Sequence, residues 1–220
     1  MLERQRTQPG VPPVDSLVFD LDGTLWDTCE ACALGWNNVL ERHRIAFRKI
    51  TPSDVRSVAG KPHALCIRET FVGLPEDQLK ILDQETQEED NRLIAEMGGL
   101  LYAGVAEGVG DLAARFPLYI VSNCQAGYIE IFLKFTGFSR FFRDYECFGN
   151  TGRPKSENLQ AIITRNALKS PLFIGDTAGD QAAASVNAVP FAFASYGYGT
   201  CANPQMTLRS FHELRSLLLT

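Results

Sequence analysis

The stretch LVFDLDGTLWDT, residues 17–28, places Asp20 and Asp22 directly after an apolar run. The two aspartates are two positions apart, so both carboxylates can be directed to the same side as the strand ends. Bringing two anions together costs free energy unless a cation or a shared proton separates them. The stretch therefore predicts a buried strand that ends at a charged site.

Apolar runs of strand length recur along the chain, each followed by a helix-like segment. Together with the first run, they cover residues 17–19, 118–121, 172–174 and 189–194. Apolar positions spaced three and four apart, as in Ile129, Phe132 and Leu133, indicate amphipathic helices. Fully apolar strands that alternate with such helices are typical of a parallel sheet covered on both faces. We therefore predict an α/β fold.

Residues 28–100 break this alternation. They are predicted to form helices alone, one of which is capped by Thr51 and has Pro52 at its first position. The acidic run 83–90 is expected to be a solvated helix face. A helical insertion thus separates the first strand from the second. The expected organisation is a flexible tail over residues 1–13, a core built from residues 14–27 and 101–220, and a helical unit over residues 28–100.

Composition limits the class of partner. The chain has 220 residues, 45% of them hydrophobic, and a net charge of -5. The chain has no surplus of basic residues that would favour binding to nucleic acid or to an anionic membrane, so we expect a small-molecule partner. We expect a monomer or homodimer. No run approaches the ~18 apolar residues of a membrane-spanning helix, and the first residues lack the apolar centre of a secretory signal. The cysteines are expected to remain reduced thiols, which favours the cytoplasm.

Polar side chains follow several of the predicted strands. In an open parallel sheet, ligands bind outside the carboxyl ends of the strands. Besides the two opening aspartates, the candidates are Ser122, Asn123, Lys155, Asp176 and Asp180. The carboxylates form an all-oxygen site that suits Mg²⁺. Lys155, the Ser122–Asn123 turn and main-chain amides near Gly23 would hold the oxygens of a phosphate group.

These residue types divide the work of phosphoryl transfer. A carboxylate can act as a nucleophile and form an aspartyl-phosphate, while a second acid protonates the leaving oxygen and later activates water. We assign Asp20 as the nucleophile and Asp22 as the acid and base. The transferred group needs positioning and charge neutralisation, which Mg²⁺, Lys155 and Ser122 would supply.

The order of these clusters resembles the haloacid dehalogenase superfamily, in the Mg²⁺-dependent phosphatase branch that includes phosphoglycolate phosphatases. The opening D-x-D-G-T is similar to the first motif of that family, and Ser122 after a hydrophobic strand is similar to the second. Lys155 is similar to the third motif, and GDTAGD, residues 175–180, is similar to the fourth. The resemblance spans the chain from Asp20 to Asp180 and extends beyond it.

The resemblance implies a Rossmann-like core and a magnesium site. In this family Mg²⁺ would be held by Asp20, the main-chain carbonyl of Asp22, and Asp176, with Asp180 supporting the waters of the metal. It also implies that the helical insertion is a cap that closes over the substrate. Within such a cap, Lys61 is our candidate for a residue that sets substrate specificity.

The sequence leaves some alternatives open. Lys155 follows Pro154, whereas relatives commonly carry the lysine before a proline, so Arg153 is a rival for the third motif. The leading activity is a Mg²⁺-dependent phosphatase that hydrolyses a small phosphorylated metabolite. A phosphomutase of the β-phosphoglucomutase type is the first alternative, since it uses the same core. A non-catalytic phosphate-binding regulator is the second.

Overall fold

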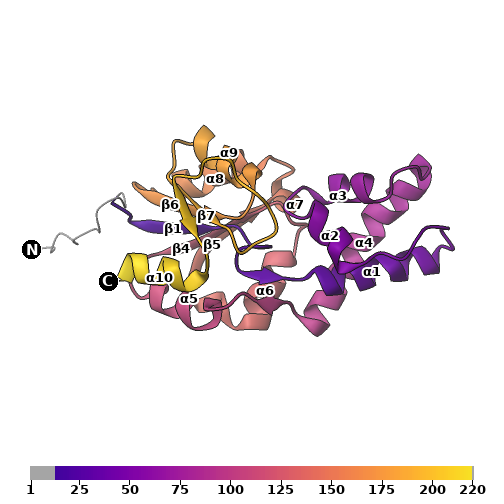
Figure 1. The fold of residues 1–220 in the computed structure, drawn as a ribbon, viewed down its shortest axis with the longest axis horizontal. Coiled ribbons are helices and arrows are strands. Elements are labelled where there is room, and N and C mark those ends of the chain that lie inside the picture. The colour runs from indigo at the N-terminus through magenta and orange to yellow at the C-terminus, as the bar shows by residue number, and fades with distance from the viewer. Residues whose placement is uncertain (1–12, 220) are drawn as a thin grey trace, which may run out of the picture.

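The computed structural model describes residues 13–219. Within this range, six strands form one parallel sheet in the order β5-β4-β1-β6-β7-β8 (Figure 1). They are β1 (Ser16–Phe19), β4 (Leu118–Ser122), β5 (Phe142–Cys147), β6 (Pro171–Gly175), β7 (Phe191–Ala194) and β8 (Met206–Leu208). Helices cover both faces, so the predicted α/β fold is confirmed. The predicted tail, residues 1–13, lies outside the described residues except for Pro13.

Side chains of the central strand alternate between two hydrophobic layers. Leu17 and Phe19 pack into one layer and Val18 into the other, and all three are fully buried. Phe19 stacks on Phe211, with ring centroids 6.0 Å apart. A strand that is covered on both faces must be apolar at every position, which explains the uninterrupted run in the sequence. The first layer contains α5 (Val105–Ala113), α6 (Tyr128–Thr136) and α10 (Phe211–Leu219), and the second contains α8 (Lys155–Arg165) and α9 (Ala178–Val186).

Between β1 and β4 the chain forms a helical lobe, which lies beyond one end of the sheet in Figure 1. We define the lobe as α1 (Cys29–Arg42), α2 (Pro52–Val58), α3 (His63–Thr70) and α4 (Glu76–Met97). Two short antiparallel strands, β2 (Trp26–Asp27) and β3 (Leu100–Leu101), join it to the rest of the molecule. The Thr51 side chain accepts a hydrogen bond from the Asp54 amide, and Pro52 is the first residue of α2, as the sequence predicts.

The edge strands β5 and β8 are absent from the sequence-based prediction. Strand β5 has the sequence FRDYEC, in which charged side chains interrupt the apolar ones. An edge strand is hydrogen-bonded on one side only and tolerates such residues, so its pattern is weaker than that of a central strand. Strand β7 also begins two residues later than predicted. The short helices η1 (Phe138–Arg140) and α7 (Phe148–Thr151) flank β5.

The expectation that the acidic run 83–90 is a solvated face is wrong for part of the run. Asp90 is only 2% exposed, and Trp36 Nε1 of α1 donates to its Oδ2 at 3.1 Å. Thr86 is fully buried as well. A run of this length covers two helical turns, so some of its residues must point to the side of α4 that packs against α1.

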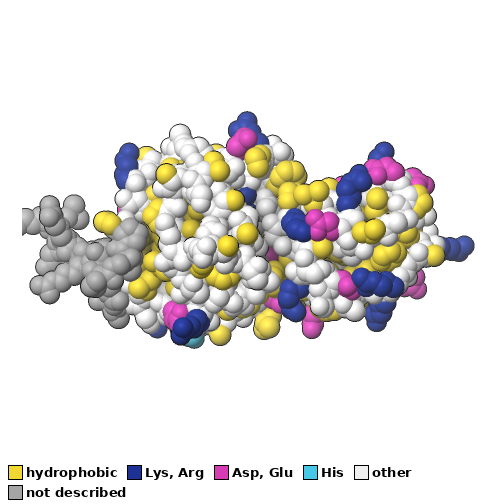
Figure 2. Space-filling model, turned by 45° about the horizontal axis from the view of Figure 1, so that its top comes forward, with side chains coloured by type: hydrophobic (Ala, Val, Ile, Leu, Met, Phe, Trp, Pro, Cys, Tyr) yellow, Lys and Arg dark blue, Asp and Glu magenta, His cyan; other side chains and the backbone are white. Residues whose placement is uncertain are grey.

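The surface carries mixed charge. On the face shown in Figure 2, acidic and basic side chains are interspersed over the helical lobe, and a waist separates this lobe from the larger one. Among residues 13–219, no helix combines the length and the apolar character needed to cross a bilayer.

Candidate active site

The pairing of the central strands brings residues that are distant in sequence to one edge of the sheet. Strand β1 pairs in parallel with both β4 and β6. Because the three strands run in the same direction, their carboxyl ends lie together. Asp20 directly follows β1, Ser122 ends β4, and Asp176 directly follows β6.

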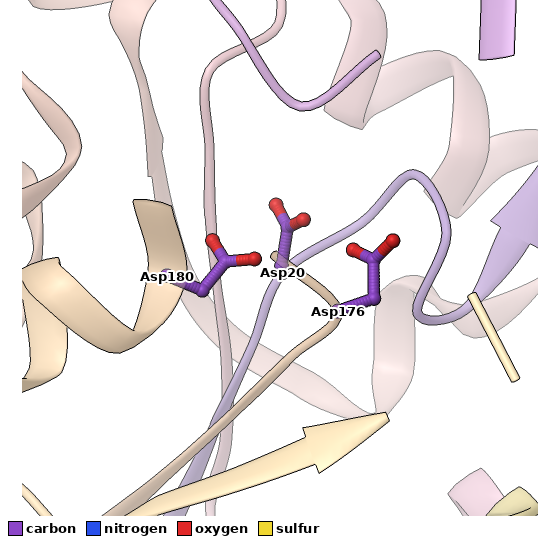
Figure 3. A group of neighbouring side chains, drawn as sticks. All are labelled: Asp20, Asp176 and Asp180. Atoms are coloured by element: carbon purple, nitrogen blue, oxygen red, sulfur yellow. The ribbon is translucent and has the colours of Figure 1, made fainter. Parts of the chain in front are cut away.

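Three carboxylates converge at this edge. Figure 3 shows Asp20, Asp176 and Asp180 side by side, with Asp180 coming from α9. One carboxylate oxygen from each residue lies within 4.8 Å of the others, and all three side chains are buried. Among the described residues, Asp20 Oδ2 is buried without a hydrogen-bond partner. Asp176 Oδ2 is held by the backbone amides of Tyr198, at 2.7 Å, and Gly199, at 3.3 Å.

Lys155 joins two of the carboxylates. It is the first residue of α8, and its Nζ lies 2.7 Å from Asp20 Oδ1 and 2.6 Å from Asp180 Oδ1. Burial lowers the pKa of the ammonium, but Asp180 and Asp20 together raise it above its ordinary value. Arg153 is exposed, so Lys155 is the member of this pair that reaches the carboxylates. Its role in binding phosphate stays a prediction.

The charge of this cluster favours a divalent cation. Burial raises the pKa of Asp20 well above its usual range, and Asp180 adds to the effect, while Lys155 opposes it. Burial, again with Asp180, raises the pKa of Asp176 to about 7. One ammonium against three carboxylates leaves a negative excess that a metal ion would neutralise. The donors are all carboxylate oxygens, so the cluster fits Mg²⁺.

The Asp22 side chain is not part of this cluster. Its Oδ1 accepts hydrogen bonds from the Tyr128 hydroxyl, at 2.6 Å, and from Thr28 Oγ1, at 3.3 Å. Burial raises the pKa of Asp22 to about 6, although the bonds from Tyr128 and Thr28 act in the opposite direction. The predicted contact between Mg²⁺ and Asp22 involves the main-chain carbonyl, and it stays a prediction. Tyr128 was not a candidate from the sequence.

Gly23 allows the loop after β1 to approach Asp176 closely. Its φ is +81°, and a Cβ at this position would lie 2.2 Å from Asp176 Oδ2. No larger residue fits here without moving the carboxylate. The Gly23 amide donates to the Trp26 carbonyl at 3.0 Å, so a phosphate oxygen would compete with this bond. The predicted phosphate contact of Gly23 stays a prediction.

A cavity extends from the carboxylates into the helical lobe. Its volume is about 80 Å³. The sheet side of its wall includes Asp20, Asp22 and Ser122, and the lobe side includes apolar residues of α1 and α2. The candidate nucleophile, Asp20, and the candidate acid, Asp22, thus line the same cavity.

The helical lobe is hydrogen-bonded to the sheet lobe beside this cavity. Asn123 Nδ2 donates to the Gly60 carbonyl at 2.8 Å, and Asn91 Nδ2 donates to the Ala126 carbonyl at 2.9 Å. Asn123 lines the cavity, but its amide is directed to the helical lobe. Its predicted phosphate contact stays a prediction.

Lys61 also lines the cavity. Its ammonium forms an ion pair with Glu69, and both side chains are more than 40% exposed. The structure therefore places Lys61 in the cavity wall, with its charge already paired. Its role in specificity stays a prediction.

Fold and site together define a protein with a parallel α/β core and an acidic cluster at the carboxyl edge of its sheet, and sequence comparison assigns the family. Residues 17–194 match the family model described as haloacid dehalogenase-like hydrolase. The chain therefore belongs to this family. A search of curated proteins finds no match to the chain.

Solved structures with the same fold are similar over almost their whole length. A structure from Haemophilus somnus 129PT, described as a predicted phosphoglycolate phosphatase, has a TM-score of 0.82 at 20% identity, covering 93% of this chain and 97% of that one. A haloacid dehalogenase-like hydrolase from Streptococcus pneumoniae has a TM-score of 0.80 at 18% identity, covering 92% and 97%. YfnB from Bacillus subtilis, described as bound to magnesium and as revealing interdomain movement, has a TM-score of 0.68 at 20% identity, covering 95% and 100%.

Proposed function

We propose that this protein is a Mg²⁺-dependent phosphatase that hydrolyses a small phosphorylated metabolite through an aspartyl-phosphate on Asp20. The observation that carries the proposal is the state of the Asp20 carboxylate. One oxygen is held by Lys155, while Oδ2 is buried without a partner at the end of a cavity. An oriented carboxylate with one free oxygen can attack phosphorus.

The surrounding residues supply the charge that the reaction needs. Asp20, Asp176 and the main-chain carbonyl of Asp22 would hold Mg²⁺, and Asp180 would support its waters. The ion would neutralise negative charge on the transferred phosphoryl group. The Lys155 ammonium and the Ser122 hydroxyl would bind and orient phosphate oxygens.

We assign Asp22 as the acid and base. The hydrogen bonds from Tyr128 and Thr28 fix the orientation of its carboxyl group. A pKa of about 6 is close to neutrality, so the group can both give a proton to the leaving oxygen and later accept one from water. In this proposal Tyr128 is a positioning residue.

We assign the helical lobe as the cap of the site, over residues 28–100, with the core formed by residues 14–27 and 101–220. The hydrogen bond from Asn123 to Gly60 supports a closed arrangement of the two lobes. The substrate would be a small phosphorylated metabolite, with no nucleic acid or membrane partner, bound by a monomer or homodimer. All six cysteines are free thiols, which supports a cytoplasmic location.

The test measures phosphate release from 4-nitrophenyl phosphate with and without Mg²⁺. We expect activity that requires Mg²⁺ and falls by at least about 10³-fold in Asp20→Asn, because the amide is not a nucleophile. Asp77→Asn, an exposed position in the first turn of α4, is the matched control and should keep full activity. Equal activity of Asp20→Asn and the wild type would reject the proposal.

A further inference from the structure

The helical lobe contributes a buried charged pair, His63 and Asp90, to the wall of the active-site cavity. Both residues line the cavity. The side chains are 10% and 3% exposed, and His63 Nε2 lies 3.7 Å from Asp90 Oδ2. They face a cavity whose other lining residues from the lobe include the apolar side chains Trp36, Val55 and Val58. A charged pair in an apolar wall affects which ligand binds, because charged groups that lose their water need a compensating partner.

Hydrogen bonding defines the charge on His63. The hydroxyl hydrogen of Thr86 goes to the Leu82 carbonyl, at 2.5 Å. The contact of 3.1 Å between Thr86 Oγ1 and His63 Nε2 therefore needs a hydrogen on Nε2. Nδ1 lies 3.0 Å from the Asp83 carboxylate, which only accepts, so Nδ1 carries a hydrogen too. His63 is thus an imidazolium with both N–H groups engaged.

Asp90 is the group of this pair that retains capacity for a ligand. Its Oδ2 accepts from Trp36 Nε1. Its Oδ1 is buried without a hydrogen-bond partner among the described residues. Gly35 provides the room for this oxygen, because a Cβ at that position in α1 would lie 2.8 Å from Oδ1. A glycine inside a helix is destabilising. The close approach of the Asp90 carboxylate to α1 explains why a glycine is present at position 35.

The two basic residues that line the cavity in the described part of the chain are already paired. Lys61 pairs with Glu69, and His63 lies between two carboxylates. A substrate whose leaving group carries a carboxylate would bring a second negative charge close to Asp90. The described lining residues offer no unpaired cation to balance that charge. An ammonium would add a positive charge next to the imidazolium of His63. A neutral hydroxyl avoids both penalties and can donate to a carboxylate.

We propose that Asp90 is a specificity-determining residue that accepts a hydrogen bond from a hydroxyl group of the leaving alcohol, so that the substrates are phosphate monoesters of neutral hydroxylated compounds. The apolar lobe residues contact the carbon skeleton of the same leaving group. This inference rests on the proposed phosphatase function and narrows its substrate class.

The test compares matched phosphate esters with the full-length protein and Mg²⁺. The ω-hydroxyalkyl phosphates with chains of two to six carbons are compared with alkyl, ω-aminoalkyl and ω-carboxyalkyl phosphates of equal length, by kcat/KM for phosphate release. At the best chain length, the hydroxyl ester should exceed the alkyl ester about tenfold, the scale of one hydrogen bond to a charged group. It should also exceed the amino and carboxyl esters. A preference for the carboxylate or the ammonium, or none at all, would overturn the inference.

Two variants on α4 separate recognition from structure. In Asp90→Asn, the side-chain oxygen can keep the bond from Trp36 while the NH₂ group replaces Oδ1, so an acceptor becomes a donor. We expect the ratio of kcat/KM for the hydroxyl ester over the alkyl ester to fall about tenfold. Asp83 is the other carboxylate that contacts His63, and it is not among the described residues that line the cavity. Asp83→Asn should therefore keep the wild-type ratio. An equal loss on all esters in Asp90→Asn would mean a structural role and overturn the inference.

Turnover of 4-nitrophenyl phosphate distinguishes the two levels of the proposal. If the wild type hydrolyses this ester but shows no preference for hydroxyl esters, the specificity inference fails and the phosphatase function stands. If it hydrolyses no ester with Mg²⁺ present, both fail.

Discussion

Lys155 and Asp20 form a buried ion pair, with Nζ 2.7 Å from Oδ1, although 135 positions separate them in the sequence. The contact exists because α8 begins at Lys155 beside the end of β1. It orients the candidate nucleophile and leaves its second oxygen free. In the proposed mechanism Lys155 therefore has both a structural and a catalytic role, and one substitution can test the two.

We expect Lys155→Met to lower kcat/KM for any phosphate ester about 10²–10³-fold, since it removes a preorganised positive charge from the phosphate site. The variant should also be less stable by about 3–5 kcal/mol without Mg²⁺, because buried carboxylates lose their partner. Urea unfolding and steady-state kinetics measure the two effects. Lys134→Met, in the exposed last turn of α6, is the control and should change neither. Wild-type kinetics in Lys155→Met would contradict the assigned role.

Binding of Mg²⁺ should be visible without any measurement of activity. Titration with Mg²⁺ should raise the Tm of the wild type, since the ion binds to the folded carboxylate cluster and not to the unfolded chain. Asp176→Asn removes one carboxylate of the cluster and should reduce this Mg²⁺-dependent shift by more than half. Differential scanning fluorimetry with and without EDTA gives the measurement. A shift of equal size in both proteins would show that Asp176 is not a ligand.

The central strands and the candidate carboxylates were predictable because their signals are local. Asp20 and Asp176 each directly follow a fully buried strand, so a short window of sequence contains both the strand and the charged end. The helical insertion was predictable for a similar reason, since caps such as Thr51 act within one turn. These signals can be recognised without knowledge of contacts between distant parts of the chain.

Other parts of the site depend on contacts that a single sequence does not display. Tyr128 looks like a core residue at the start of an amphipathic helix, and only the packing of α6 near Thr28 places its hydroxyl on Asp22. Asp90 lies in an acidic run and looks solvated, whereas α1 covers it. Tyr198 reaches Asp176 through its backbone amide, which has no side-chain signature. Burial by a distant helix was the missing information in the first two cases.

The role of Tyr128 can be tested through the leaving group. Tyr128→Phe removes the 2.6 Å hydrogen bond that orients Asp22. An alkyl phosphate needs a proton on its poor leaving group, whereas 4-nitrophenolate leaves readily without one. We expect kcat/KM to fall about tenfold or more for an alkyl phosphate and by a much smaller factor for 4-nitrophenyl phosphate.

The control for this experiment is Tyr145→Phe on the edge strand β5, which should leave both values unchanged. Equal losses on the two esters in Tyr128→Phe would indicate that the tyrosine supports the fold or the phosphate site and does not position the acid.

The buried imidazolium of His63 should make the stability of the helical lobe depend on pH. Burial lowers the pKa of His63, but hydrogen bonds and charges from Asp83 and Asp90 raise it above its ordinary value. Because the pKa is higher in the folded protein, the stabilisation is complete below about pH 6.5, the pKa of an unperturbed histidine. It is lost as the pH rises through the folded pKa.

The free energy of unfolding should therefore fall more steeply with rising pH in the wild type than in His63→Gln, by up to about 1.4 kcal/mol per pH unit. Urea unfolding at pH 6, 7, 8 and 9 measures the difference. His212→Gln, at a side chain that is 53% exposed, is the control and should follow the wild type. If the free energy of unfolding changed with pH in the same way in the wild type and in His63→Gln, the assignment of His63 as an imidazolium would be contradicted. Because Thr86 and Asp83 each require a hydrogen on the ring, that outcome would also require a different hydrogen-bond arrangement around Asp90.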